Sequence, residues 1–165
     1  MALHKLLGFT YMPAIYVGGR AQANVALGGK ATQSSTQFSA DAHRAIDGSN
    51  NWNGKMGSCT ETKPSRNPWW TVNLKRVYTV STVRITNRMD CCSNELLGAE
   101  LRIGNSVRSN ANDNKLCGKV TTVTESYTFI CRGFTGQYVN IVIPGHNKVL
   151  TLCEVEVFGK LHSRK

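Results

Sequence analysis

The amino-acid sequence predicts an all-β domain, a β-sandwich or jelly roll stapled by disulfide bonds. Six short segments alternate apolar and polar residues with the period of a half-buried strand: 70–74, 83–85, 101–103, 127–131, 139–143 and 155–157. Segments rich in turn-forming residues separate them, at 28–29, 47–57, 105–118 and 144–147. No stretch longer than about ten residues keeps a helical period. Short strands at regular spacing are typical of sandwiches, in which the loops at one end carry the function.

The N-terminal segment has some features of a secretory signal. His4 and Lys5 give a short basic region, 6–17 is mostly apolar, and Ala21-Gln22-Ala23 fits a cleavage site. We therefore expect residues 1–23 to be removed and the protein to be secreted; the alternative is an N-terminal extension. No linker or repeat divides the remainder, so 24–159 is predicted to be one domain, followed by the basic tail 160–165.

The six cysteines also favour an oxidising compartment. Their number is even and they lack the spacing of a zinc site, so disulfides are the better interpretation. Cys91 and Cys92 are adjacent, and a bond between them would hold two Cα atoms at about 3.8 Å, closer than ordinary disulfides prefer. Such a ring would be a stiff apolar knuckle beside Arg88, suited to a sugar; two free thiols are the alternative. Spacing alone does not fix the other pairs.

Charge and composition argue against two other classes of protein. The net charge is +10, but the basic residues are scattered singly apart from the tail, and aromatic residues do not interleave with them. We therefore expect no nucleic-acid site and no insertion into a membrane. The sequence lacks a Gly-x-Ser-x-Gly elbow, and two of its four histidines are close to the termini, so we expect no enzymatic activity.

Several motifs resemble one family closely. The matching segments are 24–35, 45–49, 57–59, 67–70, 86–92, 98–105 and 152–157, and the Cys-Cys pair and the Cys-Glu-Val-Glu-Val ending are the most specific. Together they are similar to the F-type lectins, or fucolectins, over residues 24–159. The resemblance implies a discoidin-like β-jelly roll, recognition of fucosylated or other cell-surface glycans, and an often trimeric homo-oligomer. It also implies three disulfides: Cys59–Cys153, Cys91–Cys92 and Cys117–Cys131.

The resemblance further implies a structural Ca²⁺ ion near the sugar site. The family's ligands correspond here to two carboxylates, one hydroxyl and three backbone carbonyls, an all-oxygen set that suits this cation. The side-chain ligands would be Asp47, Ser58 and Glu154, and the carbonyls those of Arg44, Ser49 and Cys153.

The family's sugar-binding triad is only partly present. Its pattern is a His, twenty-six residues, Arg-x-Asp, four residues, and an Arg or Lys, which places Arg88 and Asp90 beside Cys91 and Cys92. The positions of the His and the final base hold Glu61 and Glu95 instead. Arginine only donates hydrogen bonds, whereas an ionised glutamate only accepts them. Fucose binding should therefore be weakened or altered.

Three functions follow from these observations. The first is a secreted, Ca²⁺-stabilised carbohydrate-binding protein of glycan recognition or innate defence, with changed fucose specificity. The second is an interaction module that keeps the lectin scaffold without binding sugar. The third is a binder of polyanions such as heparin-like glycans, through the basic faces and tail.

Overall fold

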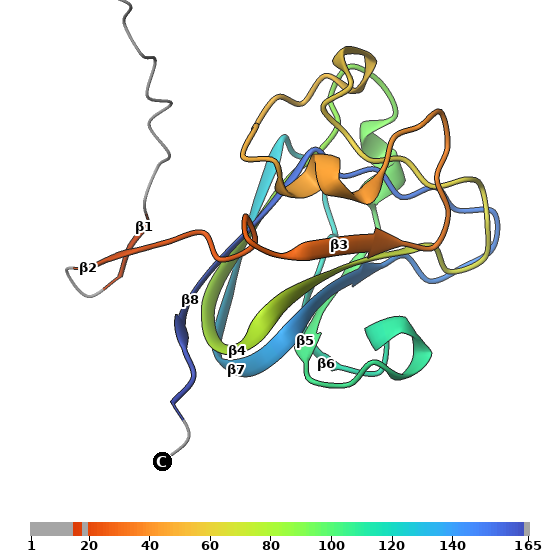
Figure 1. The fold of residues 1–165 in the computed structure, drawn as a ribbon. Helices are drawn as coiled ribbons and strands as arrows, with labels where there is room; N and C mark the ends of the chain where they lie inside the picture. Colours follow the sequence, from red (N-terminus) through yellow and green to blue (C-terminus); the bar gives the residue numbers. More distant parts are fainter. Residues whose placement is uncertain (1–14, 18–19, 164–165) are drawn as a thin grey trace, which may run out of the picture.

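The computed structural model describes residues 15–17 and 20–163. They form eight strands and four 3₁₀ turns (Figure 1). In chain order these are β1 (Ile15–Val17), β2 (Arg20–Gln22), β3 (Lys30–Gln33), η1 (Ala42–Ile46), η2 (Gly54–Met56), β4 (Trp69–Thr86), η3 (Ser93–Leu96), β5 (Glu100–Gly104), η4 (Arg108–Ala111), β6 (Lys115–Lys119), β7 (Ser126–Val142) and β8 (Glu154–Leu161).

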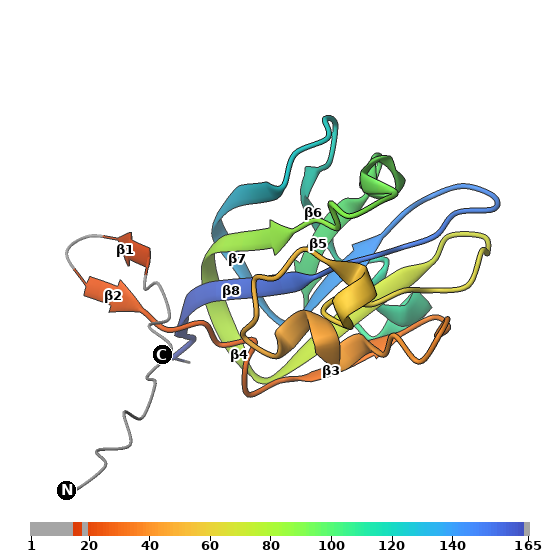
Figure 2. The same ribbon diagram turned by 90° about the horizontal axis from the view of Figure 1, so that it is seen from above.

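One antiparallel sheet makes up most of the molecule. Its strand order is β3-β4-β7-β5-β6, and β8 pairs with β4. The first half of β4 pairs with β3 and the second half with β8, while β7 runs along both halves. Figures 1 and 2 show β4 and β7 bending together, so that the curled sheet encloses a core between two arms. The structure confirms the predicted all-β, disulfide-stapled fold.

The bend accounts for a difference from the predicted elements. Segments 70–74 and 83–85 belong to one strand, β4, and 127–131 and most of 139–143 belong to β7. The register between them shifts after the Asn73–Tyr138 pair, where residues 74–77 bulge out opposite Gln137. A bulge bends a strand without ending its pairing. One long strand therefore appears in the sequence as two separate segments of alternating residues.

Two short strands of the main sheet escaped prediction because they lack apolar alternation. β3 contains one buried residue, Ala31, and β6 has none, although β6 lies in the segment 105–118 that was expected to be a turn. Both lie at edges of the sheet, where pairing requires only one neighbour. That expectation was wrong for residues 115–118.

The core ties the functional loops to the sheet. Trp70, Ile141 and Leu152 are completely buried in one cluster together with Ala45 of η1. The indole Nε1 of Trp70 donates to the Ala42 carbonyl oxygen at 2.9 Å, which fastens η1 over the open end of the curled sheet. Full burial of such a side chain contributes about 1.5–3 kcal/mol. The loops at this end therefore rest on a rigid base.

The predicted terminal segments contain regular structure where they are described. β1 and β2 form a hairpin within the predicted signal segment, whose residues 1–14 and 18–19 lie outside the described part; its cleavage stays a prediction. At the other end, β8 continues into the predicted tail, and the His162 N–H donates to the Val77 carbonyl at 2.9 Å. Within the described residues, no helix has the length and apolar character needed to cross a membrane.

The three disulfides are those that the family resemblance implied. Cys59 bonds Cys153, Cys117 bonds Cys131, and Cys91 bonds its neighbour Cys92. No described cysteine is left free. The alternative of two adjacent free thiols is therefore wrong.

Candidate functional site

The loop after β4 holds the predicted sugar-site residues at the open end of the sheet. Asn87, completely buried, fastens this loop: its side-chain Nδ2 donates to the carbonyls of Ser93 and Thr124 at 3.0 and 3.1 Å. Cys92 has a positive φ of 59° and directly precedes η3, whose Leu96 is buried in the core. The segment from Arg88 to Glu95 is thus anchored at both ends.

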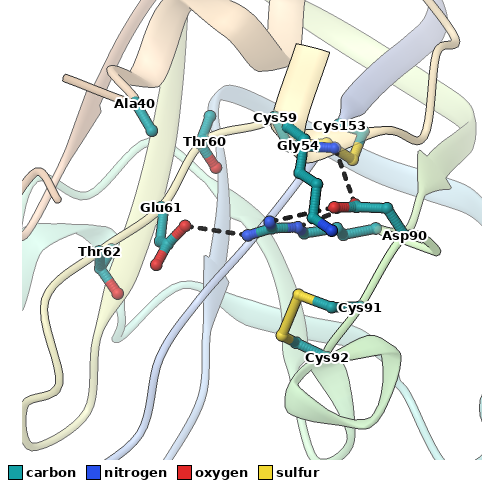
Figure 3. A network of polar contacts seen from close by, with 12 residues as sticks. Ala40, Gly54, Cys59, Thr60, Glu61, Thr62, Asp90, Cys91, Cys92 and Cys153 are labelled. Atoms are coloured by element: carbon teal, nitrogen blue, oxygen red, sulfur yellow. Dashed lines mark hydrogen bonds and ion pairs between the residues drawn. A yellow bond between two sulfur atoms is a disulfide. The ribbon is translucent and has the colours of Figure 1, made fainter. Parts of the chain in front are cut away.

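Arg88 is the centre of a network of charges, of which Figure 3 labels Asp90, Glu61 and Gly54. Its Nε and Nη2 donate to the two carboxylate oxygens of Asp90 at 3.0 and 3.2 Å, and its Nη1 donates to Glu61 Oε2 at 2.9 Å. The structure therefore brings together three of the four predicted charged residues. A guanidinium has five N–H donors, and three of them are used inside the protein.

The same contacts make Asp90 part of the scaffold. Besides Arg88, its Oδ1 accepts a hydrogen bond from the Gly54 N–H at 2.8 Å, and its side chain is only 7% exposed. These hydrogen bonds, above all those from Arg88, lower the pKa of Asp90 to about 2. Asp90 therefore stays ionised and holds the guanidinium in place.

Gly54 belongs to the site but was not identified from the sequence. A Cβ atom at this position would lie 2.3 Å from Arg88 Nε, so any side chain would displace the guanidinium. The neighbouring contact of the Met89 N–H with the Trp52 carbonyl at 3.1 Å joins the two loops. A glycine in a turn-rich segment gives no local signal of such a contact, because its partner lies far away in the sequence.

Glu61 comes from a third segment. Residues 60 and 62 are buried threonines, and their N–H groups donate to the carbonyls of Leu152 and Leu150 at 2.7 and 3.1 Å. Because neighbouring side chains of an extended segment point to opposite sides, Glu61 points to the side opposite these threonines. Figure 3 shows its carboxylate pointing towards the network. Its second oxygen, Oε1, makes no hydrogen bond to a described residue.

Glu95 lies near this network without joining it. Its carboxylate forms no ion pair or hydrogen bond with a described residue, and it is partly buried on η3. Burial raises its pKa, and the negative charge of Glu61 raises it further. The site therefore contains one arginine and three carboxylates, and two of these carboxylates repel each other.

Apolar surface lies close to these charges. The Cys91–Cys92 disulfide follows Asp90 directly, and Figure 3 shows it on one side of the network. Trp52 and Met89, which the backbone contact above joins, are 39% and 37% exposed. Sequence reasoning missed both, although an exposed tryptophan in a loop is a recognised feature of binding surfaces. A stiff apolar edge beside hydrogen-bonding groups suits the two faces of a sugar ring.

One of the predicted Ca²⁺ ligands, Glu154, is an unusual side chain. Glu154 begins β8 and is completely buried, and neither of its carboxylate oxygens has a hydrogen-bond partner among the described residues. Burial, with added repulsion from Asp47 and Glu156, raises the pKa of Glu154 to about 9. A buried carboxylate without a partner is costly. Its oxygens fit the requirement of a cation.

The other predicted ligands lie on two segments, one at η1 and one beside Cys59. Asp47 ends η1 and its Oδ1 accepts from the Ser49 N–H at 2.8 Å, and Arg44 lies in the same turn. The Cys59–Cys153 disulfide joins the segment of Ser58 to that of Glu154 across a separation of 94 residues. No cluster of three or more Asp, Glu, His or Cys side chains that could hold a metal occurs in the described part of the chain. The predicted set is of a different kind, two carboxylates completed by a hydroxyl and carbonyls.

Comparisons with known proteins identify the family. The family model of the NedA-like galactose-binding domain matches residues 44–141. Fucolectin-5 of Anguilla japonica is 43% identical over 155 residues, which cover 89% of this chain and 79% of that protein. The chain belongs to the fucolectin family. The predicted resemblance is thereby confirmed.

Three solved structures extend the comparison. The fucolectin from the serum of Morone saxatilis superposes with a TM-score of 0.82 at 45% identity, covering 85% of this chain and 50% of that one. The present chain thus spans half the length of that fucolectin. A Streptococcus pneumoniae fucose-binding module has a TM-score of 0.77 at 29% identity and is covered completely. The lectin domain of lectinolysin, solved with Lewis b antigen, has a TM-score of 0.73 at 27% identity.

Proposed function

We propose that this fucolectin is a secreted, Ca²⁺-stabilised glycan-binding protein of glycan recognition or innate defence, in which free fucose binds weakly. Its relatives are lectins, and two structural relatives are described as binding fucose or complexed with Lewis b. The site that carries the proposal is the loop end with Arg88, the Cys91–Cys92 disulfide and Trp52. Fucosylated or other cell-surface glycans are the proposed partners.

One contact carries the argument for weakened fucose binding. Glu61 Oε2 accepts a hydrogen bond from Arg88 Nη1 at 2.9 Å, so a donor that a sugar would use is already engaged. A hydrogen bond to a charged group contributes about 1.5–3 kcal/mol. A ligand must therefore compete with Glu61, or bind to the remaining acceptors of Glu61 and Glu95 through its own hydroxyl donors. The second mode favours sugars with several free hydroxyl groups.

Ca²⁺ would stabilise the base of this site. The two free oxygens of Glu154, the carboxylate of Asp47 and the hydroxyl of Ser58 would hold it, together with the carbonyls of Arg44, Ser49 and Cys153. When bound, the ion supplies positive charge that neutralises a buried carboxylate. The Glu154 carboxylate would then hold the start of β8 in place relative to η1. In this way the ion supports the loops at the open end of the sheet.

The test exchanges the two glutamates for the residue types of the family pattern. The double substitution Glu61→His with Glu95→Arg is expected to raise the affinity for free L-fucose by about tenfold or more, because it replaces two acceptors with donors. Each single substitution should give less, since one carboxylate remains beside the sugar. Isothermal titration of all four proteins measures the effect.

A charge-lowering control tests whether fucose affinity simply follows the net charge, which the double substitution raises. Lys63→Glu and Arg66→Glu alter exposed positions on the same segment and should leave fucose affinity unchanged. Wild-type protein that binds fucose as tightly as the double variant would refute control by the triad. A wild-type chain that binds no glycan of a broad array, with or without Ca²⁺, would instead favour an interaction module on a lectin scaffold, which the engaged state of Arg88 also allows.

A further inference from the structure

The bend of the curled sheet gathers basic side chains at the end opposite the candidate site. At this bend β3 begins, β4 bulges and β8 ends. These three parts of the sheet all lie on the same side of strand β7. Lys30 pairs with Asn73, Lys160 pairs with Thr79, and the His162 N–H donates to the Val77 carbonyl. Residues far apart in the sequence thus meet within a few strand spacings of about 4.8 Å.

The bulge of β4 contributes two further cations. Residues 74–77 protrude opposite the single residue Gln137. Asn73 Oδ1 stabilises the bulge by accepting from the Lys75 N–H at 2.7 Å and from Gln137 Nε2 at 3.0 Å. Lys75 has a positive φ of 67°, and both Lys75 and Arg76 are exposed. We name Lys30, Lys75, Arg76 and Lys160 the bend cluster.

No opposing charge neutralises the bend cluster within the described structure. The ion pairs of the described residues involve Arg84, Arg88 and Arg102, and none of the four cluster residues. The segments that meet at the bend, 24–34, 69–80, 130–140 and 157–163, contain no Asp or Glu. The neighbouring β5–β6 loop carries Asp113, whose carboxylate accepts from Ser106 Oγ at 3.1 Å. Acidic residues gather instead around Arg88 and Glu154.

We propose that the bend cluster is a binding site for a sulfated polysaccharide, independent of the sugar site at the loop end. Four exposed lysine and arginine side chains with no ion pair among the described residues suit sulfate and carboxylate groups repeated along a chain. Among the described side chains of these segments, two large apolar ones, Ile130 and Leu161, are strongly exposed, and two isolated side chains do not make the continuous apolar face of a membrane-binding element. The nearest aromatic residue on β4, Tyr78, is only partly exposed, which disfavours stacking of nucleic-acid bases.

The two ends of the molecule would then act on different ligands. A glycan held at the loop end and a polyanion held at the bend would lie on opposite sides of one rigid sheet. A protein that binds two ligands on the same surface at once gains avidity through effective concentration.

The experiment compares two variants of equal net charge. The bend variant carries Lys75→Asn, Arg76→Gln and Lys160→Gln; asparagine at position 75 tolerates the positive φ. The matched control carries Lys55→Gln, Lys63→Gln and Lys148→Gln, three exposed lysines that form no ion pair with a described residue. Binding to heparin, the probe for a sulfated polysaccharide, is titrated at a series of salt concentrations, and thermal melting verifies that both variants fold.

The expected result is a selective loss. The bend variant should bind heparin about tenfold or more weakly at physiological salt, with the salt dependence reduced by about one counterion for each cation removed. The control should bind nearly as the wild type does. Equal losses in both variants would overturn the proposal in favour of net charge alone. Wild-type binding to anionic vesicles or single-stranded DNA but not to heparin would overturn the choice of ligand.

Discussion

Two carboxylates at the same end of the molecule have pKa values that are shifted in opposite directions. Asp90 receives hydrogen bonds from Arg88 and the Gly54 N–H, and its pKa is lowered to about 2. Glu154 has no hydrogen-bond partner for either oxygen among the described residues, and burial raises its pKa to about 9. Glu154 is completely buried, whereas the Asp90 side chain stays 7% exposed, so deeper burial and the lack of a partner both separate the pKa of Glu154 from that of Asp90.

The difference distinguishes scaffold from binding site. A carboxylate whose oxygens are saturated by protein donors holds other residues in place and has little capacity for a ligand. A buried carboxylate whose oxygens are free has a cost that only a cation or a proton removes. By the same reasoning Arg88, with three of five donors engaged, is a weaker sugar ligand than a free arginine would be.

Substitution of the two carboxylates by their amides should have opposite effects. In the presence of EDTA, Asp90→Asn is expected to lower the free energy of unfolding by about 3 kcal/mol, because it leaves a largely buried guanidinium with only Glu61. Glu154→Gln should raise it by about 1 kcal/mol at neutral pH, because a carboxyl group with a native pKa of about 9 must take up a proton on folding and a glutamine need not. Urea unfolding of both variants and the wild type measures the two changes. Changes of the same sign would mean that the hydrogen-bond partners do not decide the difference.

Calcium should act on only one of the two carboxylates. Because the ion is proposed to bind the native state, a hundredfold excess over its dissociation constant should stabilise the wild type by about 2.7 kcal/mol, or roughly 5–10 °C in melting temperature. Glu154→Gln should abolish most of this shift and Asp90→Asn should keep it. Calorimetry with EDTA and with millimolar Ca²⁺ tests this. Identical wild-type melting curves would remove the metal site from the proposal.

Acid should lower the free energy of unfolding through Asp90. Because the pKa of Asp90 is lower in the native state than its ordinary value of 3.8, its contribution is complete above that value and is lost as the pH falls towards 2. The loss should reach about 2 kcal/mol. Urea unfolding between about pH 5 and pH 2 should therefore show a smaller acid-induced decrease in Asp90→Asn than in the wild type. Parallel curves for the two proteins would show that the pairing with Arg88 adds nothing in this range.

Local patterns in the sequence determined the fold class, and motifs determined the family. Alternation in 101–103 and 155–157 predicts strands because neighbouring side chains on a strand point to opposite faces whatever the rest of the chain does. The spacing of Glu61, Arg88 and Glu95 identified the altered triad, and the resemblance supplied the disulfide pairs. These inferences depend on nearest neighbours or on matched motifs, so they needed no coordinates.

Only the tertiary structure decided which of these groups meet. Glu61 engages Arg88 across 27 residues, and Gly54 binds Asp90 across 36, because the loops after separate strands converge at one end of the curled sheet. The bulge at 74–77 joins two predicted strands into one and brings Val77 beside His162 at the end of β8. A sequence pattern specifies the face on which a side chain lies, but the path of the chain specifies its neighbour across that face. The free oxygens of Glu154 and the basic bend are consequences of that path.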